Sequence, residues 1–369
     1  MEEQRLNGGG EGGRGEGGRG EGGRGAAGAG ARRREVRVVE DAVELTRAAA
    51  AEVTAALALH RDAWLPGTAA GTASGAAAAP FPSIALAGGS TPRALYRLLA
   101  DPAAPFRARI DWQAVHFFWG DERHVPPDHP DSNFRMAREA MLDHVQVPAA
   151  HVHRIAAEEP DAARAARLYE RGLIDAFGLR RDRGNGKDAT GDDGAAGDAG
   201  AAGDAGAAHG AVSMSDAGAA RGASAVSDAG ATRGADAASD AAREWPRFDL
   251  VLLGLGEEGH TASLFPGSPL LADDGPRRPG RPRRPRRLVA SVWVEKLATW
   301  RITLTPPVLN HAATVIFLVS GAAKAAALAA VLEGEWRPEL YPAQVVAPVD
   351  GRLLWLVDRA AAAQLRSSA

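Results

Sequence analysis

One histidine, His260, stands in a glycine-rich segment, GLGEEGHTASLFP at residues 254–266, directly after the apolar run Phe248–Leu253. An apolar run followed by glycines is typical of a buried parallel strand that ends in a tight turn, where the backbone can approach a ligand closely. Ligands bind beyond the carboxyl ends of the strands in open α/β sheets. Histidine suits acid–base chemistry there because its ordinary pKa lies near neutral pH. The alternative is that His260 only caps the helix that follows.

A second strand-to-helix junction has the features of an anion site. The apolar strand predicted at Ser83–Ala87 runs into the sequence GGSTP, and proline behind serine and threonine favours the start of a helix. Backbone N–H groups are unpaired at a helix start, and two hydroxyls stand beside them, so an anion can bind. The candidate residues are Gly88, Gly89, Ser90 and Thr91. The alternative is an ordinary capped turn without a ligand.

A third predicted strand, Val115–Phe118, is followed after Gly120 by four consecutive ionisable residues. These are Asp121, Glu122, Arg123 and His124. A proline-rich stretch separates them from a predicted helix at Asn133–Leu142, which indicates a long ordered loop of the kind that often carries function. The alternative is a solvated run of charges on the surface.

Two cations accompany the later strands of the chain. The alternation in RITLTP places Arg301 on one face of a predicted strand and Ile302 on the other. The next strand, Thr314–Val319, leads through a Ser-Gly pair into an alanine-rich helix with Lys324 in its first turn. A cation there opposes the helix macrodipole, which makes sense if an anion binds nearby. The alternative is an exposed lysine without a role.

Five motifs in this order are similar to those of the 6-phosphogluconolactonase family, within the glucosamine-6-phosphate isomerase/6-phosphogluconolactonase superfamily: GGSTP, DERHVP with a following SN, GxGxxGHTASLFP, RITLTP and SGxxK. The resemblance extends over nearly all the non-repetitive sequence. It implies an enzyme that hydrolyses 6-phospho-D-glucono-1,5-lactone to 6-phospho-D-gluconate in the oxidative pentose phosphate pathway. It also implies a fold shared with glucosamine-6-phosphate deaminases and ribose-5-phosphate isomerases.

The hydrolysis of a lactone, which is a cyclic ester, needs an activated water and a stabilised oxyanion but no cofactor. We assign His260 as the general base because of its loop and of the resemblance. Glu258 could orient the imidazole, as the carboxylate of a catalytic triad does. The family usually has Asp at this position, so three arrangements are open. The loop shifts, Glu258 takes a different rotamer, or Asp121 or Glu122 orients His260 instead.

A phosphate dianion binds best to several charge-assisted donors at once. The cations predicted to hold it are Arg123 and Lys324, together with the N–H groups and hydroxyls of residues 88–91. Arg301 is a second-rank candidate. Each of these cations could instead stabilise the oxyanion of the lactone, and the sequence does not separate the two roles.

No sequence motif indicates a metal. The chain has no cysteine, which excludes disulfides and is compatible with a reducing compartment, and its histidines lack the HExxH spacing of metalloproteases. His116 lies in an apolar strand and is predicted to be a core residue, whereas His151 and His153 are compatible with a surface strand. We therefore expect neither a metal nor a cofactor.

Three segments of low complexity interrupt the chain. Residues 1–34 repeat EGGRG, residues 184–242 repeat units such as GDAG, and residues 273–287 hold seven arginines among prolines. We expect disorder in them because they contain too few bulky apolar side chains. The alternatives are nucleic-acid binding by the tail and attraction of an anionic substrate by the arginine-rich insertion. The remainder of residues 35–369 suits one α/β domain.

The net charge and the hydropathy of the chain limit the partners and the location that we expect. The formal net charge of −3 gives no sign of general binding to nucleic acid, and no apolar run reaches the roughly 20 residues that span a bilayer. The N-terminus lacks the apolar core of a secretory signal. We expect a cytoplasmic protein whose partner is a small phosphorylated sugar lactone. The sequence leaves the oligomeric state open, and a monomer is compatible with it.

Strands and helices alternate along the chain, which predicts a three-layer α/β fold with a largely parallel sheet and helices on both faces. The predicted strands are Val36–Val39, Ser83–Ala87, Val115–Phe118, Phe248–Leu253, Arg301–Leu304, Thr314–Val319 and Leu353–Val357. The predicted helices are Asp41–His60, Pro92–Leu99, Asn133–Leu142, Pro160–Phe177, Gly321–Leu332 and Asp358–Leu365.

Two other functions fit the same pattern. A sugar-phosphate isomerase or an amino-sugar-phosphate deaminase would also need a phosphate site, a histidine and a carboxylate. Deaminases, however, resemble GHIAFNEP after the histidine, whereas this chain has SLFP at residues 263–266. A non-enzymatic sugar-phosphate-binding domain would need no catalytic histidine, and His260 is present.

Overall fold

The computed structural model describes residues 34–63, 80–179, 244–272 and 287–366. The predicted insertion at residues 184–242 lies outside these ranges, as do all but the last residue of the predicted tail and of the insertion at 273–287. Residues Arg34–Ala369 form one unit of the fold.

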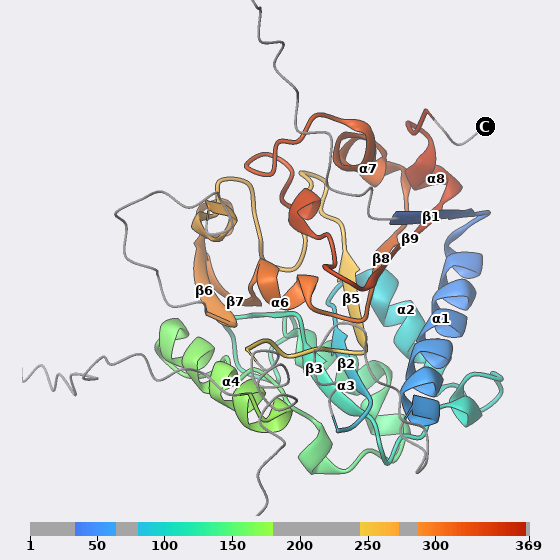
Figure 1. Ribbon diagram of the computed structural model, residues 1–369, viewed down its shortest axis with the longest axis vertical. Helices are drawn as coiled ribbons and strands as arrows, with labels where there is room; N and C mark the ends of the chain where they lie inside the picture. The colour runs from blue at the N-terminus through green and yellow to red at the C-terminus, as the bar shows by residue number, and fades with distance from the viewer. Residues whose placement is uncertain (1–33, 64–79, 180–243, 273–286, 367–369) are drawn as a thin grey trace, which may run out of the picture. The chain divides into compact units, whose positions relative to one another are not determined.

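Six strands form the central sheet, in the order β1-β9-β8-β5-β2-β3 (Figure 1). Every neighbouring pair in this sheet is parallel. The strands are β1 Arg34–Val39, β2 Ser83–Leu86, β3 His116–Trp119, β5 Leu250–Gly254, β8 Thr314–Val319 and β9 Arg352–Asp358. The six strands predicted for this sheet are therefore confirmed within a few residues.

The inner strands of this sheet are buried on both faces. Each of β2, β5, β8 and β9 has at most one residue that is not buried. Parallel strands covered on both faces have nearly continuous apolar sequences, such as TVIFLV in β8, because helices pack above and below them. The α/β class with a mainly parallel sheet is thus confirmed.

Seven α-helices belong to the part of the chain that the structure describes. They are α1 Ala42–Ala63, α2 Ser90–Ala100, α3 Asn133–Ala140, α4 Ala162–Phe177, α6 Pro306–Asn310, α7 Ala325–Glu333 and α8 Arg359–Ala362. Figure 1 shows α1 beside α2 and α7 beside α8, and these pairs are in contact. The helix predicted from Gly321 begins instead with a 3-10 turn, η6 (Ala322–Lys324), and α8 is half as long as predicted.

Three further strands form a separate antiparallel sheet in the order β4-β7-β6. They are β4 Asp121–Arg123, β6 Val289–Val294 and β7 Thr299–Leu304, and α4 packs on β6 and β7. The structure corrects the expectation that residues 121–124 form a loop, because the first three pair with β7. A strand of three charged residues has no hydrophobic period that a sequence could reveal. β6 was not predicted.

Two buried tyrosines fix the strand ends that precede the functional site. The Tyr96 hydroxyl on α2 donates to the carbonyl oxygen of Ala87 at 2.8 Å and accepts from its N–H at 2.9 Å. Tyr169 on α4 makes the same two bonds to Trp119, both at 2.9 Å. Burial raises the pKa of both phenols, so they stay protonated and keep both bonds.

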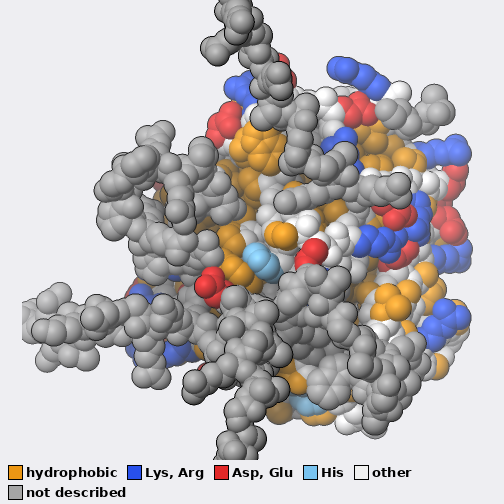
Figure 2. Space-filling view, viewed as in Figure 1, with side chains coloured by type: hydrophobic (Ala, Val, Ile, Leu, Met, Phe, Trp, Pro, Cys, Tyr) orange, Lys and Arg blue, Asp and Glu red, His pale blue; other side chains and the backbone are white. Residues whose placement is uncertain are grey.

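The edge of the central sheet carries a network of ion pairs. Arg37 lies 2.8 Å from both Glu35 and Glu52, and Arg352 binds the same two carboxylates. Figure 2 shows basic and acidic side chains mixed at the right edge of the molecule, where Figure 1 places β1 and α1. None of the helices in the described ranges combines the length and the apolar composition needed to cross a bilayer.

Candidate active site

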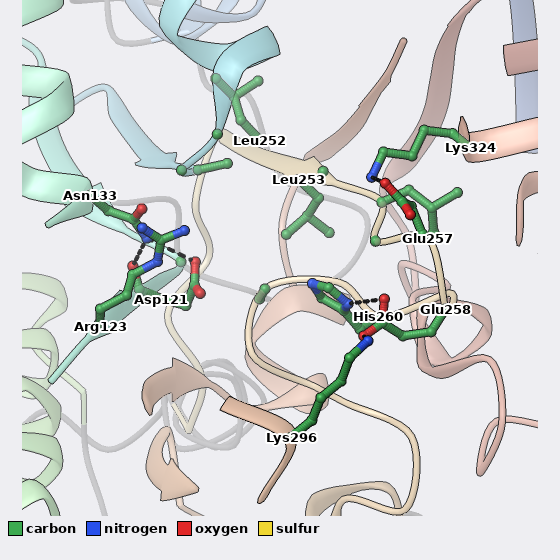
Figure 3. Close-up of a pocket in the computed structure, with 18 residues that line it drawn as sticks. Asp121, Arg123, Asn133, Leu252, Leu253, Glu257, Glu258, His260, Lys296 and Lys324 are labelled. Carbon is green, nitrogen blue, oxygen red and sulfur yellow. Dashed lines mark hydrogen bonds and ion pairs between the residues drawn. The ribbon is translucent and has the colours of Figure 1, made fainter. Parts of the chain in front are cut away.

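An open cavity of about 600 Å³ lies at the carboxyl ends of β2, β3 and β5. Both sheets contribute to it, because the 3-10 helix η5 (Glu295–Leu297) in the turn between β6 and β7 forms part of the wall. The polar lining side chains are Asp121, Arg123, Asn133, Glu257, Glu258, His260, Lys296 and Lys324 (Figure 3). This is the edge of a parallel sheet at which ligands usually bind.

His260 lines the cavity from the turn after β5. The Gly256 N–H donates to the His260 carbonyl oxygen at 2.8 Å, and the Phe265 ring stacks on the imidazole with centroids 4.2 Å apart. A Cβ atom on Gly256 would lie 2.0 Å from His260 Nδ1, so only glycine leaves room for the ring. The next helical residue is Pro269, at the start of η4 (Pro269–Ala272), so His260 caps no helix.

The surroundings of His260 keep its imidazole neutral. Burial lowers the pKa of His260, whereas the carboxylates of Glu258 and Asp121 act to raise it. Lys324 acts in the same direction as burial, and the balance leaves the pKa below the ordinary value. A neutral imidazole can accept a proton from water, as a general base must.

The carboxylate of Glu258 stands between His260 and Lys296. Its Oε2 lies 3.4 Å from His260 Nδ1, but this buried nitrogen has no hydrogen-bond partner among the described residues. Its Oε1 accepts from Lys296 Nζ at 3.3 Å. Burial alone would raise the pKa of Glu258, but a bond to its own backbone, His260 and Lys296 together lower it. The carboxylate of Glu258 therefore lies beside the imidazole of His260 without a hydrogen bond to it, and it becomes an ion-pair partner only when His260 is protonated.

Asp121 joins three parts of the site without a hydrogen bond to His260. The Ser263 hydroxyl, in the turn after His260, donates to Asp121 Oδ2 at 2.7 Å. Asn133 Nδ2, at the start of α3, donates to the Asp121 carbonyl oxygen at 2.9 Å. Asp121 thus holds the turn after β5 against β4 and α3, and it acts on His260 through its charge.

Glu122 is buried, lies outside the cavity wall and caps α3. Its carboxylate accepts from the N–H groups of Arg123, Asn133 and Phe134 at 2.7–2.8 Å and from the Ser132 hydroxyl at 3.1 Å. Burial raises the pKa of Glu122 although these donors oppose the shift. Its oxygens are occupied, so Glu122 does not orient His260.

Arg123 and Arg301 form a pair of adjacent cations. Arg123 lines the cavity, and its Nη1 donates to the Asp131 carbonyl oxygen at 2.5 Å. Arg301 lies directly opposite it in the β4–β7 register and does not line the cavity. Burial, and then the neighbouring charge of Arg123, lower the pKa of Arg301. Arg301 therefore adds positive potential behind Arg123.

Only two of the four predicted anion-binding residues at 88–91 line the cavity. Gly88 and Gly89 do so, and Gly89, with a φ of 108°, is the N-cap of α2. A Cβ atom on Gly88 would lie 1.9 Å from Asn133 Oδ1, so this glycine lets α3 approach β2. Ser90 and Thr91 form the first turn of α2 and are not part of the wall.

Lys324 reaches the cavity from the N-cap position of α7. Its Nζ lies 3.9 Å from Glu257 Oε1 (Figure 3). The turn before it is held by Asp358, which accepts hydrogen bonds from the Ser320 hydroxyl and the Gly321 N–H. The place of the cation next to a helix start is thus fixed by the end of β9.

Three polar side chains of the wall were not nominated from the sequence: Asn133, Glu257 and Lys296. Asn133 had a signal, since it is the second residue of the SN pair in the motif that begins with DER. Lys296 had none, because it stands in a hairpin turn whose first strand was not predicted.

His116, which was predicted to be a core residue, belongs to a stacked cluster outside the wall of the cavity. His116 Nδ1 lies 2.9 Å from His153 Nε2, and its ring stacks between Phe81 at 3.7 Å and His151 at 3.9 Å. Burial, with the two neighbouring histidines, lowers the pKa of His116 to about 4. His151 ends a 3-10 helix rather than a strand. Within the described ranges, no group of three or more His, Asp or Glu side chains could hold a metal ion.

The sequence of the chain is similar to those of one family of known proteins. The family model described as glucosamine-6-phosphate isomerases/6-phosphogluconolactonase matches residues 67–189 and 207–355. The chain is 34% identical over 284 residues to a 6-phosphogluconolactonase of Synechocystis sp., covering 77% of this chain and 85% of that one. It is 33% identical over 295 residues to a 6-phosphogluconolactonase of Mycobacterium tuberculosis, with the same coverage of 77% and 85%.

A solved structure extends this similarity to the fold. The 6-phosphogluconolactonase from Trypanosoma brucei superposes with a TM-score of 0.57 at 25% sequence identity. The match covers 90% of this chain and 99% of that one.

Proposed function

The chain belongs to the glucosamine-6-phosphate isomerase/6-phosphogluconolactonase family, and from this premise we propose that His260 is the general base of a lactone hydrolase. The chain is an enzyme that hydrolyses 6-phospho-D-glucono-1,5-lactone to 6-phospho-D-gluconate, the second step of the oxidative pentose phosphate pathway. The observation that supports the base most directly is a partly buried imidazole, whose pKa burial lowers, in a cavity wall that also carries three cations.

His260 takes a proton from the water that attacks the lactone carbonyl. Attack gives a tetrahedral oxyanion, and the ring C–O bond then breaks, with the proton returned to the leaving ring oxygen. Because the pKa of His260 is lowered, the imidazole is neutral and ready as a base at pH 7. Once it is protonated, the negative charge of Glu258 at 3.4 Å stabilises the imidazolium.

Asp121 supports the same proton transfer from a greater distance. Its carboxylate raises the pKa of His260 without a hydrogen bond to the ring. Its bonds to Ser263 and Asn133 hold the turn that carries His260. Asp121 therefore both positions His260 and raises its pKa.

The phosphate of the substrate binds at the wall formed by Arg123, Gly88 and Gly89. The start of α2 supplies N–H groups and the positive end of its dipole, and Arg123 supplies a guanidinium, with Arg301 behind it. Lys324, on the other side of His260, stabilises the oxyanion. This division places the two ends of the substrate at two separate groups of donors.

A phosphorylated sugar lactone is the small-molecule partner in this proposal, and the reaction chemistry requires no cofactor. Two statements stay predictions: that the protein is located in the cytoplasm, and that it is a monomer, which the sequence allows.

Purified enzyme and freshly made 6-phosphogluconolactone test this function, with the spontaneous opening of the lactone subtracted. His260→Ala should lower kcat/KM by about 10²-fold or more, whereas His144→Ala, an exposed histidine outside the cavity, should not. Activity of the wild type should fall as the pH drops below the lowered pKa of His260. An inactive wild type would refute the lactonase function, and glucosamine 6-phosphate and pentose phosphates would then be tested as substrates.

A further inference from the structure

Lysine is rare in this chain. Only three of its 43 basic Lys and Arg residues are lysines, at positions 187, 296 and 324. Lys187 lies outside the described residues, and the other two both line the cavity. An ammonium is a compact charge with freely rotating donors, whereas a guanidinium is a planar fork that fits both oxygens of a carboxylate. Although arginine is far more common in this chain, both of the described lysines therefore lie in the cavity that also contains His260.

Lys296 connects the two sheets at the cavity. It stands in η5, within the hairpin of the antiparallel sheet, while Glu258 stands in the turn after β5 of the parallel sheet. Lys296 Nζ lies 3.3 Å from Glu258 Oε1, and the side chain of Lys296 is 74% exposed. An ion pair this exposed contributes little to the free energy of unfolding. A contribution to stability therefore does not explain this ion pair, whereas a role in the site can.

The two oxygens of Glu258 have different neighbours. Oε1 faces Lys296, and Oε2 faces His260 Nδ1 at 3.4 Å (Figure 3). A glutamate side chain has three rotatable bonds, and His260 gives this one no hydrogen bond to hold it. The contact with Lys296 is the bond from another side chain that fixes the carboxylate among the residues described.

We propose that Lys296 is a positioning residue, which holds one oxygen of Glu258 so that the other stays beside His260 Nδ1. This inference rests on the proposed function of the cavity. Lysine is needed because it binds a single oxygen. An arginine would engage both oxygens and draw the carboxylate away from the imidazole.

Loss of the ammonium should change both the geometry and the charge around the base. The charged groups that act on His260 are Glu258 beside it, Asp121 from β4 and Lys324 from η6, with Glu257 paired to Lys324. Without Lys296, the charge of Glu258 is less balanced, and the pKa of His260 should rise. The freed carboxylate should also orient the imidazole less well.

Steady-state kinetics of four variants test the proposal: Lys296→Met, Lys296→Arg, Glu258→Gln and the double variant Lys296→Met/Glu258→Gln. Lys296→Met should lower kcat about tenfold, change KM less than about twofold and move the acid limb of the pH profile upward. Lys296→Arg should not restore kcat. In the Glu258→Gln background, Lys296→Met should have no further effect, because the two residues act as one unit.

A matched control removes an exposed cation from another ion pair. Arg47 lies 2.6 Å from Glu44 on α1 and does not line the cavity, so Arg47→Met should leave all kinetic constants unchanged. A raised KM with unchanged kcat in Lys296→Met would mean that the lysine binds substrate, and it would overturn the proposal. Additive effects in the double variant, or full activity of Lys296→Arg, would overturn it as well.

An NMR titration of the histidine rings gives a second test that needs no turnover. The His260 signal is assigned by its absence in His260→Gln. Its pKa should be higher in Lys296→Met than in the wild type and unchanged in Arg47→Met. An unchanged pKa would contradict the coupling through Glu258, even if another phosphorylated sugar proved to be the substrate. Failure of the lactonase function itself would instead appear as an inactive wild type with the shift still present.

Discussion

Replacing Gly256 by alanine should displace the imidazole of His260 while the fold persists. A Cβ atom at position 256 would lie 2.0 Å from His260 Nδ1 and 2.2 Å from its Cε1. Ordinary contact begins near 3.4 Å, so the ring or the turn must move by about 1.4 Å. The stacked ring of Phe265, at 4.2 Å, limits the directions in which the imidazole can retreat.

The expected loss follows from that displacement. A misplacement of about 1 Å in a catalytic group costs about 10²-fold in rate, so kcat/KM should fall by about 10²-fold. This corresponds to about 2.7 kcal/mol of transition-state stabilisation. The side chain of His260 borders an open cavity, so the ring can move there. The free energy of unfolding should therefore fall by only about 1 kcal/mol, the low end for added core volume.

Gly254→Ala, at the last residue of β5 and two positions before Gly256, is the matched control. A Cβ atom at position 254 meets nothing within 4 Å, although this glycine also lines the cavity. Lactone hydrolysis above the spontaneous rate and thermal unfolding should be measured for both variants. The reasoning would be refuted by a Gly256→Ala enzyme whose kcat/KM stays within about threefold of that of Gly254→Ala.

Two further predictions concern stability. Glu122→Ala leaves two N–H groups at the start of α3 and the N–H of Arg123 in β4 without their acceptor, so it should lower the free energy of unfolding by about 3 kcal/mol. Glu139→Ala, at an exposed position of the same helix, should change it little, and equal effects of the two variants in denaturant unfolding would contradict the cap. His116 has a pKa of about 4 in the fold and an ordinary value of 6.5, so its contribution to stability is complete above pH 6.5 and is lost as the pH falls toward 4. The melting temperature of His116→Phe should therefore depend less on pH in this window, and an unchanged slope would count against the assignment.

The local patterns of the chain predicted most of the central sheet and part of the site. Apolar runs followed by glycine gave the strands that end at the cavity, and they placed His260, Arg123 and Lys324 at its wall. Ser90 and Thr91 were nominated on the same grounds but do not line it. A sequence shows which residues follow a strand, but the direction in which each side chain points depends on the turn that the backbone makes there.

The antiparallel sheet could not be predicted from local sequence patterns. β4 has only three residues, all charged, and it becomes a strand because β7 offers it a partner, with Asp121 opposite Thr303. Glu122 reads as one more acid in a charged run, yet it is buried as the cap of α3. Neither fact follows from propensity, because pairing partners distant in sequence decide both.

The sequence by itself determined the six strands of the central sheet and the histidine that follows β5, because hydrophobic period and glycine turns act over a few residues. Only the tertiary structure decided which side chains meet there. Ser263 bonds Asp121 across 142 positions of sequence, and Lys296 reaches Glu258 across 38. These contacts depend on the order of strands and on how two sheets face each other. That geometry is set by packing of the whole domain, and no short stretch of sequence encodes it.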